Sequence, residues 1–224
     1  MRCRAYLAWG FLAVCFLLHS VLAQQPLKPP SKSSTNPKAA TVDTGTISGG
    51  VYRNTTFAFT YKLAFGWVNR TQEMSEDSND GSAPDSAGSK KSVLLLGVFE
   101  RPPESTGDSV NSAVVVAAEP TSSYPGLRSP EQYFGPLTEL TKAKGLSVVN
   151  EPYDFPVGTM QLVRGDFSKP VGKLTMRQST VVMIEKGYVV SFTFIGGSED
   201  EVDELVGYLS FDRRQSSASQ MTPE

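Results

Sequence analysis

Cysteine and histidine are nearly absent from this 224-residue chain, and those present lie close to its start: Cys3, Cys15 and His19. Beyond residue 23 the chain therefore has neither a thiol nor an imidazole. These absences exclude a Ser-His-Asp triad or a Cys-His pair within one chain, a zinc site built from His or Cys, and a disulfide. An enzyme of this sequence would have to work with carboxylates, lysine, tyrosine, serine or an oxygen-ligated metal.

An excess of positive charge is also missing. The chain has 21 basic and 23 acidic residues; without Arg2 and Arg4, 19 basic residues remain and the net charge is −4. This balance offers no electrostatic footprint for nucleic acid or for an anionic membrane. After residue 23, no apolar run approaches the roughly 20 residues that a membrane-spanning helix needs. We therefore expect neither nucleic-acid binding nor a transmembrane segment beyond that point.

The first 23 residues have the order of a secretory signal peptide. Arg2 and Arg4 supply positive charge, residues 5–18 are apolar, and Ala23 ends a short segment of the kind that signal peptidase accepts. We predict cleavage after Ala23 and a secreted or periplasmic protein. Two alternatives stay open. The segment is retained as an anchor, although its apolar run is shorter than a spanning helix needs, or Cys15 is lipidated.

Composition divides the rest of the chain. Residues 24–46 are rich in proline, lysine, serine and threonine and lack an apolar face, so we expect a flexible linker. Residues 47–212 are long enough for one domain with its own core. Within it, residues 71–92 are acidic and poor in bulky apolar side chains, which predicts a disordered loop. Residues 213–224 are expected to be a disordered tail.

Alternating and continuous apolar runs predict a sheet. Phe57, Phe59 and Tyr61 alternate with smaller or polar residues, which is the period of a half-buried strand. Further strands are expected at residues 92–99 and 113–118, as neighbours, and then at residues 158–167, 173–184 and 188–195. A short glycine-containing segment between the last two predicts a hairpin.

Two helices are predicted from their capping residues. Ser129, Pro130 and Gln132 are the N-cap, the first-turn proline and the capping-box partner of a helix expected over residues 130–144. Ser198 is the N-cap of a second helix. Antiparallel strands with helices packed against the sheet make the expected fold class α+β.

Four stretches of the domain form a recognisable combination: Tyr52-Arg53-Asn54 leading to Phe65-Gly66-Trp67, the paired strands near Leu95 and Val115, the capped helix at Ser129, and the closing strand and helix over residues 188–211. Together they resemble the PsbP-like family, which includes a photosystem II subunit, a Ran-binding import factor and many exported bacterial proteins. The family usually has a proline near the position of Ala64. The resemblance covers nearly the whole domain and implies a mostly antiparallel α+β fold that binds a protein or ligand and supplies no catalytic residue.

Four residues are candidates for binding. Arg164 and Asp166 are two apart on one predicted strand and so share a face, and Arg177 joins them if the next strand pairs alongside. We predict that they form a polar binding surface on the solvent side of the sheet; an ordinary ladder of cross-strand charges is the alternative. Trp67, beside Phe65, either lines a ligand pocket or packs at a corner of the core.

The leading hypothesis is a non-enzymatic binding or accessory domain, whose partner is a protein or a small ligand of the cell envelope. We expect no cofactor and no metal site. The alternative is a carboxylate- or metal-dependent hydrolase, which needs two converging acidic residues. The spacing of the available carboxylates selects no pair among Glu100, Glu119, Glu151 and Asp154.

Overall fold

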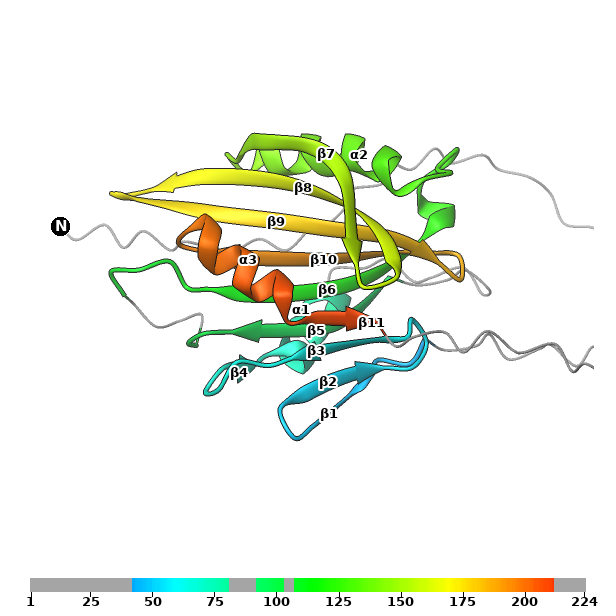
Figure 1. Ribbon diagram of the computed structural model, residues 1–224, viewed down its shortest axis with the longest axis horizontal. Helices are drawn as coiled ribbons and strands as arrows, with labels where there is room; N and C mark the ends of the chain where they lie inside the picture. The colour runs from blue at the N-terminus through cyan, green and yellow to red at the C-terminus, as the bar shows by residue number, and fades with distance from the viewer. Residues whose placement is uncertain (1–41, 81–91, 103–106, 212–224) are drawn as a thin grey trace, which may run out of the picture.

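The computed structural model describes residues 42–80, 92–102 and 107–211 (Figure 1). The predicted signal peptide, residues 24–41 of the predicted linker and the predicted tail lie outside these residues. The elements of the described part are β1 (Thr46–Ser48), β2 (Val51–Asn54), β3 (Phe59–Lys62), β4 (Val68–Asn69), α1 (Thr71–Asp80), β5 (Val93–Phe99), β6 (Ala113–Pro120), the short 3-10 helix η1 (Thr121–Ser123), α2 (Pro130–Ala143), β7 (Ser147–Val157), β8 (Met160–Val171), β9 (Leu174–Glu185), β10 (Tyr188–Gly196), α3 (Glu199–Gly207) and β11 (Leu209–Phe211).

Seven strands form the larger sheet, in the order β4-β5-β6-β10-β9-β8-β7, and all neighbouring pairs are antiparallel. The two apolar strands predicted as neighbours are β5 and β6, and the three predicted after them are β8, β9 and β10. Lys186 (φ 52°) and Gly187 (φ 78°) form the turn between β9 and β10. Positive φ at both central residues is the geometry of a two-residue hairpin, as the sequence predicts.

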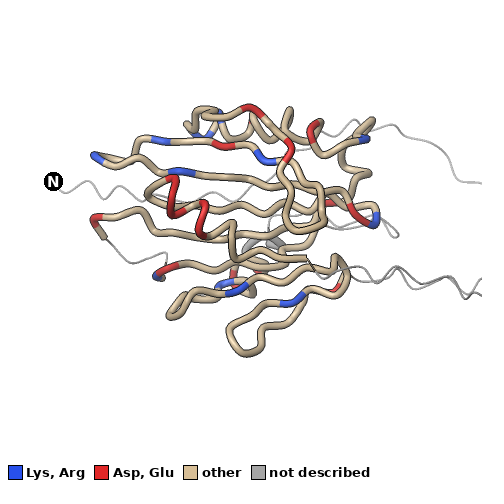
Figure 2. The backbone as a smooth tube through the Cα atoms, viewed as in Figure 1, with Lys and Arg blue, Asp and Glu red and all other residues tan. Residues whose placement is uncertain are grey.

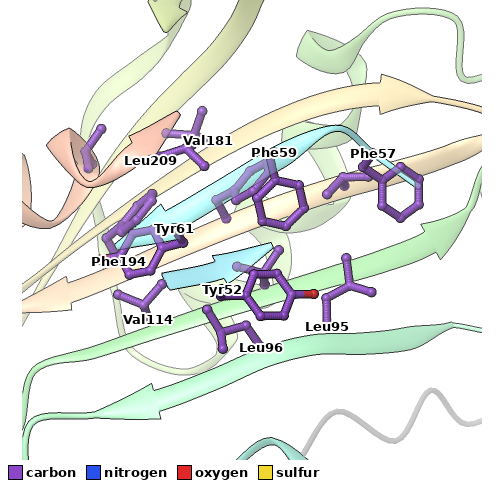
Figure 3. Close-up of a cluster of buried hydrophobic side chains, with 14 of the residues drawn as sticks. Tyr52, Phe57, Phe59, Tyr61, Leu95, Leu96, Val114, Val181, Phe194 and Leu209 are labelled. Carbon is purple, nitrogen blue, oxygen red and sulfur yellow. The ribbon is translucent and has the colours of Figure 1, made fainter. Parts of the chain in front are cut away.

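A smaller antiparallel sheet, with the order β1-β2-β3-β11, covers one face of the larger sheet together with α3. The main core lies between these layers (Figure 3). Phe59 of β3 meets Phe192 of β10 edge to face, with the ring centroids 4.9 Å apart. Tyr61 donates a hydrogen bond of 3.1 Å to the backbone carbonyl of Leu205 in α3. One cluster of side chains therefore holds both sheets and the last helix together.

Helices α1 and α2 lie on the opposite face of the larger sheet. Phe134 of α2 packs over Gly165 of β8, where a Cβ would be 2.6 Å from the ring. Met74 of α1 packs over Gly97 of β5, where a Cβ would be 2.6 Å from the sulfur. Each helix therefore approaches the sheet closely because the strand beneath it has no side chain at the contact. The domain has three layers and is α+β, as predicted.

Both predicted helices are present. Helix α2 ends one residue earlier than predicted, and Ser129 and Gln132 form the expected capping box. The hydroxyl of Ser198 accepts a hydrogen bond of 3.2 Å from the N–H of Glu201 at the start of α3. Local capping chemistry thus places both helix starts correctly.

The predicted disordered loop at residues 71–92 is wrong in its first part, because residues 71–80 form α1. Among residues 71–76, whose burial the structure describes, Met74 is the buried one, at 8% exposure. The helix start is fixed by Thr71, whose hydroxyl accepts a hydrogen bond of 2.9 Å from the N–H of Gly97. An acidic segment anchored through Met74 shows almost none of the helical periodicity of apolar residues. This explains why the sequence predicted a disordered loop here. Residues 81–91 lie outside the described part.

The opening of the domain also differs from the prediction. The single strand expected around the alternating aromatics is a hairpin of β2 and β3, whose turn includes Ala58 at φ 54°. The end of the predicted linker belongs to the domain, because Asn54 donates a hydrogen bond of 2.8 Å to the carbonyl of Asp43 and β1 begins at Thr46. All three aromatics are nevertheless buried, as their alternation predicts: Phe57, Phe59 and Tyr61.

Strand β7 was not predicted and forms one edge of the larger sheet. It contains Pro152 and Pro156, and its pairing with β8 shifts register on either side of Asn150. Prolines and register shifts are tolerated at an edge, where a strand pairs on one side only. The prolines and the register shifts also disrupt the alternating pattern of a strand, so the sequence does not predict β7.

Candidate functional site

Three of the four predicted binding residues lie together on the face of the larger sheet that α3 covers: Arg164, Asp166 and Arg177. Arg164 and Asp166 of β8 are 7% and 8% exposed. We call the following set the Arg164 cluster: Asn150, Tyr153, Arg164, Asp166, Ser179 and Asp203. Figure 2 shows the acidic residues of α3 beside the basic positions of β8 and β9.

The carboxylate of Asp166 accepts four hydrogen bonds. Its donors are Nε of Arg164 at 2.8 Å, Nδ2 of Asn150 at 3.1 Å, the hydroxyl of Tyr153 at 3.2 Å and the hydroxyl of Ser179. Burial alone would raise the pKa of Asp166, but the bonds from Ser179, Arg164 and Asn150 outweigh it and hold the pKa below its ordinary value. A carboxylate held in this way remains charged and has little capacity left for another ligand.

The guanidinium of Arg164 is held from three sides. It pairs with Asp166, its Nη2 lies 2.7 Å from Oδ1 of Asp203 in α3, and it stacks over the ring of Phe155 at 5.2 Å. Burial would lower the pKa of Arg164, but the hydrogen bonds to the two aspartates reverse the direction and raise it. Burial raises the pKa of Tyr153 to about 12. The cluster joins β8 to α3 through paired charges, and to β7 and β9 through hydrogen bonds to Asp166.

The expected solvent-facing polar surface is therefore wrong for Arg164 and Asp166. They lie on the face of β8 that α3 and β7 cover, so they are buried rather than solvated. The predicted pairing of strands does bring Arg177 to this face, beside Ser179 on β9. Arg177 is half-exposed and lines a small pocket with Glu199, and no described residue forms an ion pair with it. It is an accessible positive charge in this region.

Trp67, the fourth predicted residue, lies elsewhere, at one end of the smaller sheet. It borders a hollow of about 660 Å³ where three turns meet: the β1–β2 turn, the turn after β3 and the α3–β11 turn. We call this the Trp67 hollow, and its main lining residues are Ile47, Lys62, Leu63, Phe65, Trp67 and Tyr208. Trp67 is half-buried against the main core, so it is both a core corner and a wall of the hollow.

Phe65 stands fully in solvent beside this hollow, at 105% exposure. It occupies a tight turn in which the N–H of Trp67 donates to the carbonyl of Ala64 at 3.4 Å, and Gly66 takes a φ of 82°. A residue with positive φ at the third position of such a turn is usually glycine. The turn thus projects a large aromatic ring that makes no contribution to the core.

One cation borders the Trp67 hollow. The ammonium of Lys62 lies 5.7 Å from the ring centroid of Tyr208, and none of the described residues that line the hollow is acidic. Among the described residues, no carboxylate forms an ion pair with Lys62. Glu204 is engaged nearby as the acceptor of a hydrogen bond of 2.5 Å from the hydroxyl of Tyr208. The lining is therefore apolar with one positive charge. The sequence does not single out Lys62 as a binding residue, because a lysine at an alternating position of a strand is typical of a solvent-facing side chain.

The four carboxylates of the hydrolase alternative do not form a pair. Glu119 accepts hydrogen bonds from Tyr124 and Tyr133, on the face of the sheet that α2 covers. Glu151 and Asp154 are exposed on β7, and Glu100 is exposed beyond the end of β5. Neither the Trp67 hollow nor the pocket at Arg177 is lined by any of them.

Within residues 42–80, 92–102 and 107–211, no group of three or more acidic, histidine or cysteine residues is arranged to hold a metal ion. No helix in the same residues has the length and apolarity to cross a membrane.

No protein-family model matches the chain, and no curated protein matches it. Several solved structures are similar to it. The cyanobacterial PsbP of Synechocystis is 12% identical, with 75% of this chain and 98% of that chain covered and a TM-score of 0.44.

Two other similar structures come from different organisms. LpqN, involved in cell envelope biogenesis of Mycobacterium tuberculosis, is 12% identical over 68% of this chain and 82% of its own, with a TM-score of 0.34. The Ran-binding protein Mog1p of Saccharomyces cerevisiae is 12% identical over 72% and 84%, with a TM-score of 0.37. Likeness at this level carries nothing about what this chain binds.

Proposed function

We propose that this domain is a non-enzymatic binding or accessory module that acts outside the cytoplasm and contacts its partner at the Trp67 hollow. The observation that carries the proposal is Phe65, a ring left wholly in water at the rim of an apolar hollow. Exposing a phenylalanine costs roughly 1.5–3 kcal/mol relative to burying it. A partner that covers Phe65 and fills the hollow would recover that free energy, so the feature favours binding.

The Arg164 cluster supports a structural role instead. Its buried charges are paired with each other, and Asp166 already accepts four hydrogen bonds. A general acid or base needs a free position within reach of a substrate. Of the four residues predicted from the sequence, the proposal keeps Trp67 as a contact residue. It assigns Arg164 and Asp166 to the architecture, and leaves Arg177 as a second, separately testable contact.

Partner capture with matched variants tests the contact site. We expect the full chain to retain a partner from its native host, and Phe65→Ser to abolish retention, because the variant removes the exposed ring without touching the core. Leu174→Ser is the matched control, since Leu174 is also exposed, at 41%, but lies at the tip of the β8–β9 hairpin. Arg177→Glu tests the other region. Loss of capture in Leu174→Ser or Arg177→Glu but not in Phe65→Ser would reject the Trp67 hollow as the contact site.

Export rests on the N-terminal sequence and has its own test. The charged, apolar and small-residue segments of residues 1–23 motivate the proposal. N-terminal sequencing of protein recovered from its native host is expected to begin at Gln24. A chain that begins at Met1 and stays in the cytoplasm contradicts export, and a chain that begins at a modified Cys15 replaces simple cleavage with lipidation.

A further inference from the structure

The lining of the Trp67 hollow has the composition of a small-ligand site. Its walls are mostly apolar, from Ile47, Leu63, Phe65 and Trp67, and the single charged group is the ammonium of Lys62. Sites for small ligands typically combine apolar walls with a few placed polar groups in roughly 300–1,000 Å³. The volume of about 660 Å³ falls in that range.

The positive charge of Lys62 at the hollow favours a ligand of negative charge. Lys62 has no carboxylate partner among the described residues, and its ammonium lies over the ring of Tyr208, whose hydroxyl donates a hydrogen bond to Glu204. An unpaired ammonium beside an apolar wall attracts an anion and repels a cation. This local arrangement is independent of the net negative charge of the chain.

We propose that the Trp67 hollow binds single-chain amphiphiles with an anionic head group, with the head at Lys62 and the apolar chain against Trp67, Leu63 and Phe65. The proposal deepens the proposed function and rests on it for the site, while it adds the class of ligand. The concave shape between three turns favours one amphiphile molecule over a flat bilayer. Phe65, free at the rim, is the residue that covers the bound chain.

The chain offers a built-in reporter for this test. It has two tryptophans, Trp9 and Trp67, so the full chain with Trp9→Phe carries a tryptophan only at the hollow. Dodecanoate and dodecyl phosphate are titrated below the concentrations at which they form micelles. We expect a saturable blue shift of the Trp67 emission with both anions. Dodecyltrimethylammonium, with the same chain and the opposite charge, is expected to bind more weakly.

Variants separate the head-group contact from the apolar contact. Lys62→Gln should weaken dodecanoate binding roughly threefold and remove the preference over the cation, because an exposed ion pair changes affinity only a few-fold. Lys62→Arg should keep the preference. Lys173→Gln, which removes the same charge at the β8–β9 hairpin tip, should change nothing. Phe65→Ala should weaken the binding of both the anionic and the cationic amphiphiles by about tenfold.

Each of the following outcomes overturns the inference. Equal affinity for the anionic and cationic amphiphiles removes the role of Lys62, and an unchanged preference in Lys62→Gln does the same. A response of Trp67 to phosphatidylglycerol vesicles alone, with none to the monomers, replaces a ligand site with a membrane contact. If the monomers give no signal while Phe65→Ser still abolishes partner capture, the inference fails and the proposed function stands. If both fail, the Trp67 hollow is not a contact site.

Discussion

The Arg164 cluster and the Trp67 hollow differ in the side chains they contain and in how far those side chains are accessible to a ligand. The cluster gathers the charged side chains that a functional site would use, yet each of its buried charges already has a partner within the domain. The hollow is made of apolar side chains and one lysine, yet Phe65 is fully exposed and Lys62, over the ring of Tyr208, is exposed with no carboxylate partner among the described residues. Among the described residues, the hollow therefore has the large aromatic ring with no packing partner in the core.

This difference shows why a list of charged residues is a poor guide to a binding site. Paired charges in a covered position contribute to the uniqueness of a fold and offer little to an outside ligand. An exposed aromatic ring offers free energy to whatever covers it. The comparison predicts that substitutions in the cluster change stability, and that substitutions at the hollow change binding.

The largest effect on stability is expected from Asp166→Ala. The substitution leaves the guanidinium of Arg164 buried without its main partner, which typically costs about 3–5 kcal/mol. Urea unfolding followed by circular dichroism measures the loss. Asp203→Ala is the control, because the side chain of Asp203 is 54% exposed and its pair with Arg164 is worth at most about 1 kcal/mol. Similar losses in the two variants would show that the cluster is not organised around Asp166.

The acid stability of the domain should also depend on Asp166. Its pKa is lowered in the folded state from the ordinary value of 3.8, so its contribution is fully present above that value and is lost as the pH falls through the lowered pKa. Unfolding free energies measured from neutral pH into acid should fall less steeply for Asp166→Asn than for the unchanged chain. Parallel curves for the two proteins would contradict the assignment.

A smaller loss, of about 1 kcal/mol, is expected from Tyr153→Phe, which removes one of the four donors to Asp166. The pKa of Tyr153 is raised to about 12, so its contribution is complete below pH 10 and is lost as the pH rises towards 12. Ultraviolet titration of tyrosinate in folded protein should lose one late-titrating group in this variant. A group lost near pH 10 instead would mean that the hydroxyl is solvated.

The smallest effect on stability is expected at the hollow. Phe65→Ala should change the free energy of unfolding by no more than about 0.5 kcal/mol, because the ring touches no core residue. Phe59→Ala is the buried counterpart and should cost about 3–5 kcal/mol. A large loss in Phe65→Ala would place the ring inside the fold and remove the argument for a free contact.

Much of the fold could be predicted from the sequence because its signals are local. The capping box at Ser129, the cap at Ser198 and the turn at Gly187 each involve residues within a few positions of one another. Helix α1 and strand β7 gave no such signal. Helix α1 depends on Met74 meeting a glycine of β5, and β7 depends on pairing along an edge that tolerates its prolines.

The burial of the Arg164 cluster and the exposure of Phe65 at the Trp67 hollow were harder to predict, because both depend on segments that are distant in the sequence. The sequence placed Arg164 and Asp166 on one face of a strand, which is correct. It could not show that Asp203 of α3 and Tyr153 of β7 would bury them. It also singled out Trp67, but exposure of the neighbouring Phe65 follows only from the way three turns meet around it.

The prolines of β7 have a consequence for encounters between copies of the protein. A free sheet edge is a template on which another chain can add a strand, and the larger sheet exposes one along the eleven residues of β7. Pro152 and Pro156 have no N–H to offer an incoming strand, and the register shifts around Asn150 break the regular spacing of the remaining groups. The edge is thereby a poor template for the addition of a strand from another copy.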